Sequence, residues 1–219
     1  MPGAWLGGWV WERIVRMLKE KGHEAVPVTL TGMGDRVHLV SKDVGIETAI
    51  QDVLNLIEYN DLEDFVLVGH SFAGKVVASV ADRVPKKVRL LLYLDAFRPQ
   101  KVGTPQGSFT DAAGAGLTIP LTDEILNSIG KDVQGADLEW LRSKATPWPT
   151  RYAGDPITIS AALDSVKKAY IFCTLGGDSL EEILKEELDG PKRIIESGHW
   201  PMITKPDELV RDLLQLSEG

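Results

Sequence analysis

A strand, a sharp turn and a helix meet in residues 65–81, and this feature most limits what the chain can fold into. The apolar run F-V-L-V leads into G-H-S-F-A-G, and the small-residue stretch K-V-V-A-S-V-A follows. A turn this tight strains its central residue, Ser71, and needs small residues two places before and two places after it. Gly69 and Ala73 meet that need. The pattern predicts a serine side chain presented at the tip of a turn, at the carboxyl end of a strand.

This segment resembles the nucleophile elbow of the α/β-hydrolases, in which G-x-S-x-G joins a strand to a helix. The one departure is Ala73, because the general motif has glycine there and Gly74 comes one place later. Ser71 is therefore the candidate nucleophile. A serine nucleophile also needs a base, an orienting carboxylate and an oxyanion hole.

The base and the acid should follow the elbow, because α/β-hydrolases carry the triad in the order serine, acid, histidine. His199 is the only histidine after the elbow, and it comes directly after a predicted strand at 192–196. For the acid we prefer Asp178, four residues past a predicted strand that ends at Thr174. Asp95, which ends another predicted strand, stays open as the alternative.

Two backbone N–H groups should form the oxyanion hole. One belongs to Phe72, which follows the nucleophile, and the other is assigned to Ala4 in the glycine-rich segment 3–9. We expect the substrate pocket to be lined by residues near these groups: Trp5, His70, Trp148 and Trp200. Two alternatives stay open, a structural role for His70 inside the turn and a packing role for the tryptophans.

Strands alternate with helices along most of the chain, which predicts an α/β fold with a doubly wound, mostly parallel sheet. Residues 97–167 interrupt this rhythm and contain six of the twelve prolines. We interpret them as a short cap insertion in an α/β-hydrolase core formed by 1–96 and 168–219. The expected strands are 25–30, the elbow strand, 88–94, 168–174 and 192–196, and the main expected helices are 9–21, 44–59, the elbow helix and one that begins at Pro206.

Composition narrows the class of partner. The formal net charge is −8 and no basic stretch offsets it, so nucleic acid is not expected as a partner. The single cysteine, Cys173, permits no intrachain disulfide and suits a reducing compartment. No apolar run approaches the roughly 18 residues that span a bilayer, and no signal peptide is recognisable. We expect a cytoplasmic protein with no membrane partner, no metal and no cofactor, and a homodimer is left open.

With these residues established, the chain is similar to the α/β-hydrolase esterases grouped with plant methylesterases and hydroxynitrile lyases, and most similar to their bacterial carboxylesterase relatives. The resemblance implies a serine carboxylesterase that works through an acyl-enzyme. An apolar pocket lined by tryptophans would suit a small, hydrophobic or aromatic ester. The resemblance also assigns catalysis to Ser71 and His199 and the oxyanion donors to Ala4 and Phe72. The segments that carry it are G-A-W-L-G-G-W-V-W at 3–11, L-T-G-M-G-D-R-V-H-L at 30–39, D-V-L-N-L-I-E at 52–58, V-L-V-G-H-S at 66–71, A-D-R-V-P at 81–85, Y-L-D-A-F at 93–97 and G-H-W-P-M-I at 198–203.

Two departures from the family matter. Its members begin with an apolar strand ending in His-Gly, where this chain has Met1-Pro2, so the resemblance implies that N-terminal strands are missing from this chain. Segment 25–30 should then either stand apart from the elbow strand across a gap, or close up on it and displace Ala4. The related hydroxynitrile lyases place lysine after the histidine, whereas this chain has Trp200, whose indole carries no charge. Lyase activity is therefore disfavoured, and a non-catalytic small-molecule-binding homologue is the other alternative.

Overall fold

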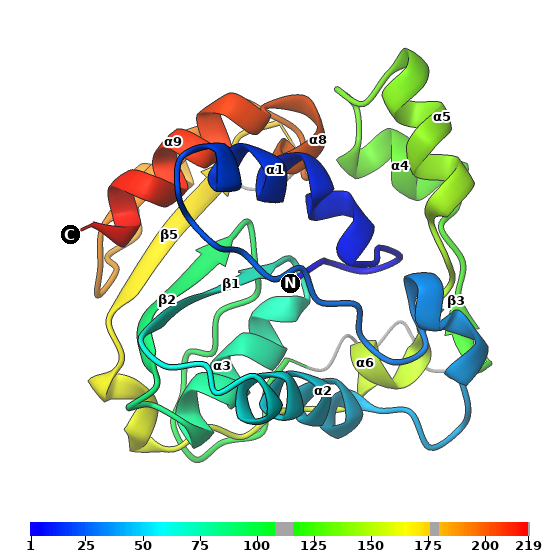
Figure 1. Cartoon of the computed structure of the whole chain (residues 1–219). Coiled ribbons are helices and arrows are strands. Elements are labelled where there is room, and N and C mark those ends of the chain that lie inside the picture. Colours follow the sequence, from blue (N-terminus) through cyan, green and yellow to red (C-terminus); the bar gives the residue numbers. More distant parts are fainter. Residues whose placement is uncertain (108–115, 176–179, 219) are drawn as a thin grey trace.

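A four-stranded parallel sheet forms the middle layer of the computed structural model, which describes residues 1–107, 116–175 and 180–218 (Figure 1). The strand order is β1-β2-β5-β6, and all three neighbouring pairs are parallel. The doubly wound sheet predicted from the sequence is confirmed. The strands are β1 Phe65–His70, β2 Val88–Leu94, β5 Lys168–Cys173 and β6 Lys192–Ile195.

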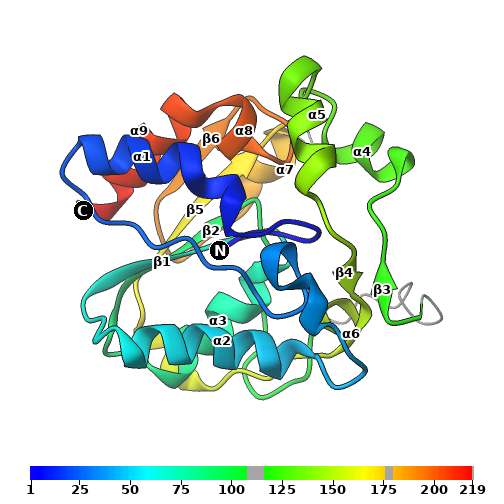
Figure 2. The same cartoon turned by 45° about the vertical axis from the view of Figure 1, so that its right-hand side comes forward.

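Helices cover both faces of this sheet (Figures 1 and 2). Helices α1 (Glu12–Glu20) and α9 (Pro206–Ser217) lie together on one face, and α2 (Ile46–Tyr59) and α3 (Ala73–Arg83) lie on the other. No helix in the described ranges is both long and apolar enough to cross a bilayer. The remaining elements are η1 Gly8–Trp11, η2 Gly34–Leu39, β3 Thr118–Ile119, α4 Asp123–Ile129, α5 Gly135–Lys144, β4 Trp148–Pro149, α6 Thr150–Gly154, η4 Ala161–Ser165, α7 Leu180–Lys185 and α8 Pro201–Thr204.

Strand β2 shows why the sheet needs helices on both sides. Leu91 and Tyr93 pack into the apolar cluster under α2 and α3, whereas Leu90 and Leu92 pack into the cluster under α1 and α9. Successive side chains of a strand point to opposite faces, so a nearly continuous apolar run is buried only when both faces are covered. Arg89 is the one exposed residue of the strand.

Segment 97–167, interpreted as a cap, contains no strand of the main sheet in its described part. Strands β3 and β4 pair with each other in a separate antiparallel ladder. Helices α4 and α5 lie to one side of the core near α8 (Figure 1), whereas α6 packs on α2 and η4 packs on α3. The cap function of this segment stays a prediction.

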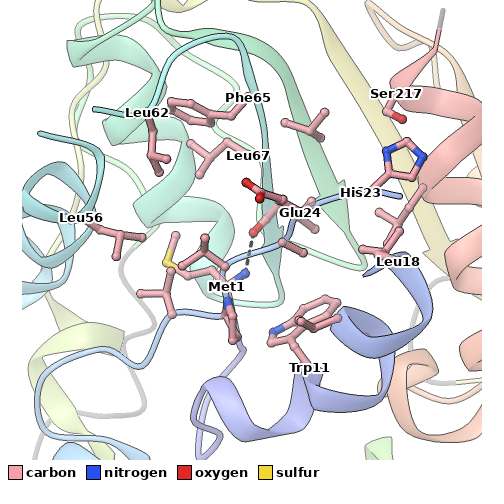
Figure 3. Close-up of a pocket in the computed structure, with 18 of the residues that line it drawn as sticks. Met1, Trp11, Leu18, His23, Glu24, Leu56, Leu62, Phe65, Leu67 and Ser217 are labelled. Atoms are coloured by element: carbon pink, nitrogen blue, oxygen red, sulfur yellow. Dashed lines mark hydrogen bonds between the residues drawn. The ribbon is translucent and has the colours of Figure 1, made fainter. Parts of the chain in front are cut away.

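The predicted strand at 25–30 is wrong, because this segment forms no strand. A groove of about 450 Å³ separates it from β1 and is lined mainly by apolar side chains of α1, α2 and β1 (Figure 3). A strand needs a ladder partner for its backbone groups, and across this groove residues 25–28 have none on β1. The predicted gap is therefore present, and the two segments have not closed up.

Met1 occupies one end of that groove. Its nitrogen donates to the Val68 carbonyl at 2.8 Å, and its carbonyl accepts from the His70 N–H at 3.2 Å. This is one rung of a parallel ladder on the free edge of β1. The rung fixes the start of the chain beside the elbow, which lets residues 3–9, here called the N-terminal loop, pass close to Ser71.

Candidate active site

Ser71 lies at the tip of the elbow with a positive φ of 59°. This left-handed conformation is uncommon for a residue with a side chain and is held only when the surroundings fix it. Here the Ser71 N–H donates to the Leu94 carbonyl at 3.2 Å, and the Ser71 carbonyl accepts from the N–H groups of Phe97 and Gly74 at 3.0 and 3.1 Å. The strained turn predicted from the sequence is confirmed.

Close packing explains the small residues around the turn. A Cβ at Gly69 would lie 2.4 Å from Val77 of α3, and a Cβ at Gly74 would lie 1.9 Å from the Phe97 carbonyl oxygen. Ala73 is fully buried yet accommodates its methyl group. Gly74 comes one place later than the glycine of the general motif. A glycine is required there because the chain that leaves β2 passes too close for a side chain.

His199 and Asp95 are joined by a short hydrogen bond. The distance from His199 Nδ1 to Asp95 Oδ2 is 2.5 Å, and each side chain is 16% exposed. The other Asp95 oxygen accepts from the Cys173 N–H at 3.2 Å, and the Asp95 N–H donates to Ile171 at 2.7 Å. The carboxylate is thus fixed to β5, and the hydrogen bond requires a proton on Nδ1. In the neutral imidazole that leaves Nε2 as a proton acceptor.

The predicted acid, Asp178, lies outside the described residues. Asp95, the alternative, lies at hydrogen-bond distance from the imidazole. Asp95 has a positive φ of 43°, so the chain turns sharply as it leaves β2, the neighbour of the elbow strand in the sheet. Asp95 is therefore the proposed acid.

His70 is a fully buried residue that bonds to backbone groups on both sides. Its Nδ1 accepts from the Gly3 N–H at 3.1 Å, and its Nε2 donates to the His199 carbonyl at 2.7 Å. Burial, and after it the neighbouring His199, holds the pKa of His70 well below its usual value. The prediction that His70 lines the pocket is corrected, because both ring nitrogens are engaged by the main chain.

The N-terminal loop passes directly against the elbow. A Cβ at Gly3 would lie 2.8 Å from the Cβ of Ser71, and Ala4 is buried. Within the described ranges, no acceptor in the protein receives the amide N–H of Ala4 or of Phe72. Both amides are therefore available to an oxyanion, and their role as donors stays a prediction.

Aromatic rings gather beside the elbow. The centroids of Phe72 and Trp148 are 5.0 Å apart, and those of Trp5 and Trp148 are 5.7 Å apart. Trp5 Nε1 donates to the Ile119 carbonyl at 3.0 Å. These contacts place Trp5 and Trp148 next to the nucleophile turn, where the pocket was predicted.

Trp200 has a different place. Its side chain is 1% exposed and belongs to the apolar cluster of α8 and α9. A Cβ at Gly130 would lie 2.4 Å from its ring, so the indole is enclosed beneath the end of α4. The prediction that Trp200 lines the pocket is corrected, because this residue packs the core.

Asp132 is a residue near the site that sequence reasoning missed. Its Oδ2 accepts from the Gly198 N–H at 2.7 Å and from the Thr204 hydroxyl at 2.8 Å. Together with the hydrogen bond from the His199 N–H to Ile129, it fixes residues 196–200, here called the histidine loop. A lone aspartate between two helices gives no sequence signal for this role. In the described part of the chain, no three histidine, cysteine, aspartate or glutamate side chains gather as a metal site.

Comparison with known proteins shows which chains this one is similar to. Residues 1–212 match the model of the alpha/beta hydrolase family. The chain is 32% identical, over an alignment 238 positions long, to a carbendazim hydrolyzing esterase of Nocardioides sp. (strain SG-4G), covering 98% of this chain and 96% of that protein. It is 23% identical, over an alignment 245 positions long, to Methylesterase 9 of Arabidopsis thaliana, covering 99% of this chain and 96% of that protein. The crystal structure of an Arabidopsis methylesterase matches 97% of this chain and 94% of its own with a TM-score of 0.82 at 20% identity. The chain belongs to the alpha/beta hydrolase family.

Proposed function

We propose that this protein is a carboxylic ester hydrolase that works through Ser71 as a nucleophile. The observation that carries the proposal is the hydrogen bond from His199 Nδ1 to Asp95. The carbonyl of the same His199 accepts from His70, the residue before the strained Ser71. The bond to Asp95 selects the tautomer whose Nε2 can take the serine proton. The esterase relatives at 32% and 23% identity support the same activity.

In the proposed reaction, Ser71 Oγ attacks the ester carbonyl carbon while His199 Nε2 takes the hydroxyl proton. The N–H groups of Ala4 and Phe72 stabilise the resulting oxyanion. The tetrahedral intermediate collapses, the C–O bond to the alcohol breaks, and the imidazolium gives its proton to the departing alcohol. Water then attacks the acyl-Ser71 with the imidazole again as base, which releases the acid and restores the serine. Asp95 stays ionised and stabilises the imidazolium.

The aromatic rings of Trp5, Phe72 and Trp148 support a small substrate with a hydrophobic or aromatic part. Carbendazim, the compound that the Nocardioides esterase hydrolyses, and methyl esters, which the plant methylesterases are named for, are the first candidates. The cytoplasmic location and the homodimer stay predictions.

The test is hydrolysis by the purified chain and by its Ser71→Ala variant. The substrates are p-nitrophenyl acetate, p-nitrophenyl butyrate, methyl esters of aromatic acids, and carbendazim. We expect turnover by the unchanged chain and a loss of about 10⁶ in kcat for the variant, as in a well-studied serine hydrolase. Equal activity in the two proteins would exclude Ser71 as nucleophile. Saturable binding of these compounds with no turnover would favour the non-catalytic homologue.

A further inference from the structure

One buried imidazole connects the two loops that flank the nucleophile. His70 precedes Ser71 in the chain and bonds Gly3 of the N-terminal loop through Nδ1 and His199 of the histidine loop through Nε2. The rings of His70 and His199 are 4.6 Å apart. These contacts join parts of the sequence that are 67 and 129 positions away from His70.

Only one form of the imidazole satisfies both contacts. The Gly3 N–H is a donor, so Nδ1 must be the bare, accepting nitrogen. The His199 carbonyl is an acceptor, so Nε2 must carry the proton. The neutral ring with its proton on Nε2 meets both demands, and the complete burial of His70 favours a neutral ring.

We propose that His70 is a positioning residue that holds the oxyanion donor and the catalytic base in register with Ser71. The inference rests on the proposed function. The bond to Gly3 fixes the backbone next to Ala4, the proposed oxyanion donor. The bond to the His199 carbonyl fixes the main chain of the proposed base. Because both bonds start from the residue before the nucleophile, a shift of the elbow moves both partners with it.

Two substitutions separate the two bonds. In His70→Asn, Oδ1 takes the position of Nδ1 and can still accept from Gly3, but no donor reaches His199. In His70→Gln, the amide nitrogen takes the position of Nε2 and can still donate to the His199 carbonyl, but no acceptor is left for Gly3. Each variant is therefore the matched control of the other.

The first readout is NMR, which does not depend on turnover. In the unchanged protein we expect the His70 ring nitrogens to show the Nε2-protonated neutral form throughout the stable pH range. We expect His70→Asn to keep the Gly3 amide protected from hydrogen exchange and to broaden the imidazole Nδ1–H signal of His199. We expect His70→Gln to do the reverse, with Gly3 exchange faster by about tenfold or more.

The second readout is ester hydrolysis well below the melting temperature of each variant. We expect kcat to fall by about 10²-fold in each variant, because a displaced oxyanion donor or base has costs of that order. We expect KM to change by less than about threefold, since the interactions lost are made in the transition state. A role confined to stability would lower the melting temperature and leave kcat unchanged.

The outcomes are distinct from those of the proposed function. Protonation of His70 Nδ1 in the unchanged protein would overturn the proposal. So would loss of both the Gly3 amide protection and the His199 Nδ1–H signal in both variants. A kcat within about twofold of that of the unchanged protein in both variants would also overturn it. If neither variant folds, the His70 tautomer in the unchanged protein still decides whether the two bonds exist. If the unchanged protein hydrolyses no ester, the proposed function fails, and the opposite NMR responses of the two variants still test the coupling of the loops.

Discussion

Asp95, at the end of β2, accepts a hydrogen bond from Nδ1 of His199 at 2.5 Å, although 104 positions separate the two residues in the sequence. The same carboxylate accepts from the Cys173 N–H at the end of β5. One side chain therefore links the ends of two neighbouring strands to the histidine loop. The proposed acid therefore comes directly after the strand that neighbours the elbow strand.

Replacing Asp95 with asparagine should lower kcat by about 10⁴ with little change in fold, because the amide can stabilise the wrong imidazole tautomer. Asp178→Asn is the comparison variant, since Asp178 was the acid preferred from the sequence. We expect that variant to keep kcat within about tenfold of the unchanged protein. Steady-state kinetics on a chromogenic ester, with circular dichroism to confirm folding, decides between them. A folded Asp178→Asn protein that is the more severely inactivated would return the role to Asp178.

Gly74→Ala should destabilise the fold, because the new Cβ would lie 1.9 Å from the Phe97 carbonyl oxygen. The Phe97 N–H also donates to the Ser71 carbonyl. A movement of Phe97 that relieves the clash would therefore displace the elbow. Gly154→Ala is the matched control, since nothing lies within 4 Å of a Cβ there. In urea unfolding we expect a loss of about 1–3 kcal/mol for the first variant and a change below about 1 kcal/mol for the second. Equal urea midpoints for the two variants would show that the chain after β2 can move away from the new methyl group without loss of stability.

Most of the core could be predicted from the sequence because its signals are local. The continuous apolar run of β2 indicates a strand that is buried on both faces, and the small residues around Ser71 indicate a tight turn. The structure contains both features. Segment 25–30 has the composition of a strand, but a strand also needs a neighbour, which a single segment does not reveal. Chain order and distance past a strand favour Asp178 and leave Asp95 open, because both aspartates follow a strand between Ser71 and His199 in the sequence. The two bonds of His70 link distant segments, and no sequence pattern records them.

The pH dependence of stability should include a contribution from Lys75. This side chain is fully buried in α3 and donates to the carbonyls of Tyr152 at 3.0 Å and Asp155 at 2.6 Å. Burial lowers its pKa to about 8, although the nearby Asp155 opposes the shift. An unfolded lysine has a pKa of about 10.4, so between these two values the unfolded chain holds a proton that the folded protein has released.

The contribution of Lys75 to the free energy of unfolding should therefore rise with pH from about 8 to about 10.4 and stay constant below that window. Lys75→Met keeps the length of the side chain without a titrating group. As the pH rises across the window, the free energy of unfolding of the unchanged protein should increase relative to that of this variant. We expect the increase to be at most about 3 kcal/mol. Urea titrations at about pH 7 and about pH 10 measure it. Parallel pH dependences for the two proteins would contradict the lowered pKa.

The groove beside β1 leads to the last prediction. The single ladder rung made by Met1 to Val68 and His70 lies at its end. In a parallel ladder, residues joined to the Met1 nitrogen would run back along β1 toward Phe65, which lines the groove (Figure 3). By the two-residue period of the strand, the N–H and carbonyl groups of Val66 face the same side as those of Val68. An added apolar strand would therefore find backbone partners and an apolar surface together.

Joining about six apolar, strand-forming residues ahead of Met1 should raise the free energy of unfolding by about 2 kcal/mol or more, since each ladder bond contributes about 1 kcal/mol and buried apolar area adds to it. Turnover should rise as well, because the strand would tether the N-terminal loop that carries Ala4. The control is an extension of equal length made of glycine and serine, which offers the same backbone without side chains to bury. Urea unfolding, the fluorescence of Trp11 in the groove and ester hydrolysis are the measurements. Equal stability and activity for the two extended proteins and the unchanged chain would show that the groove does not accept a strand.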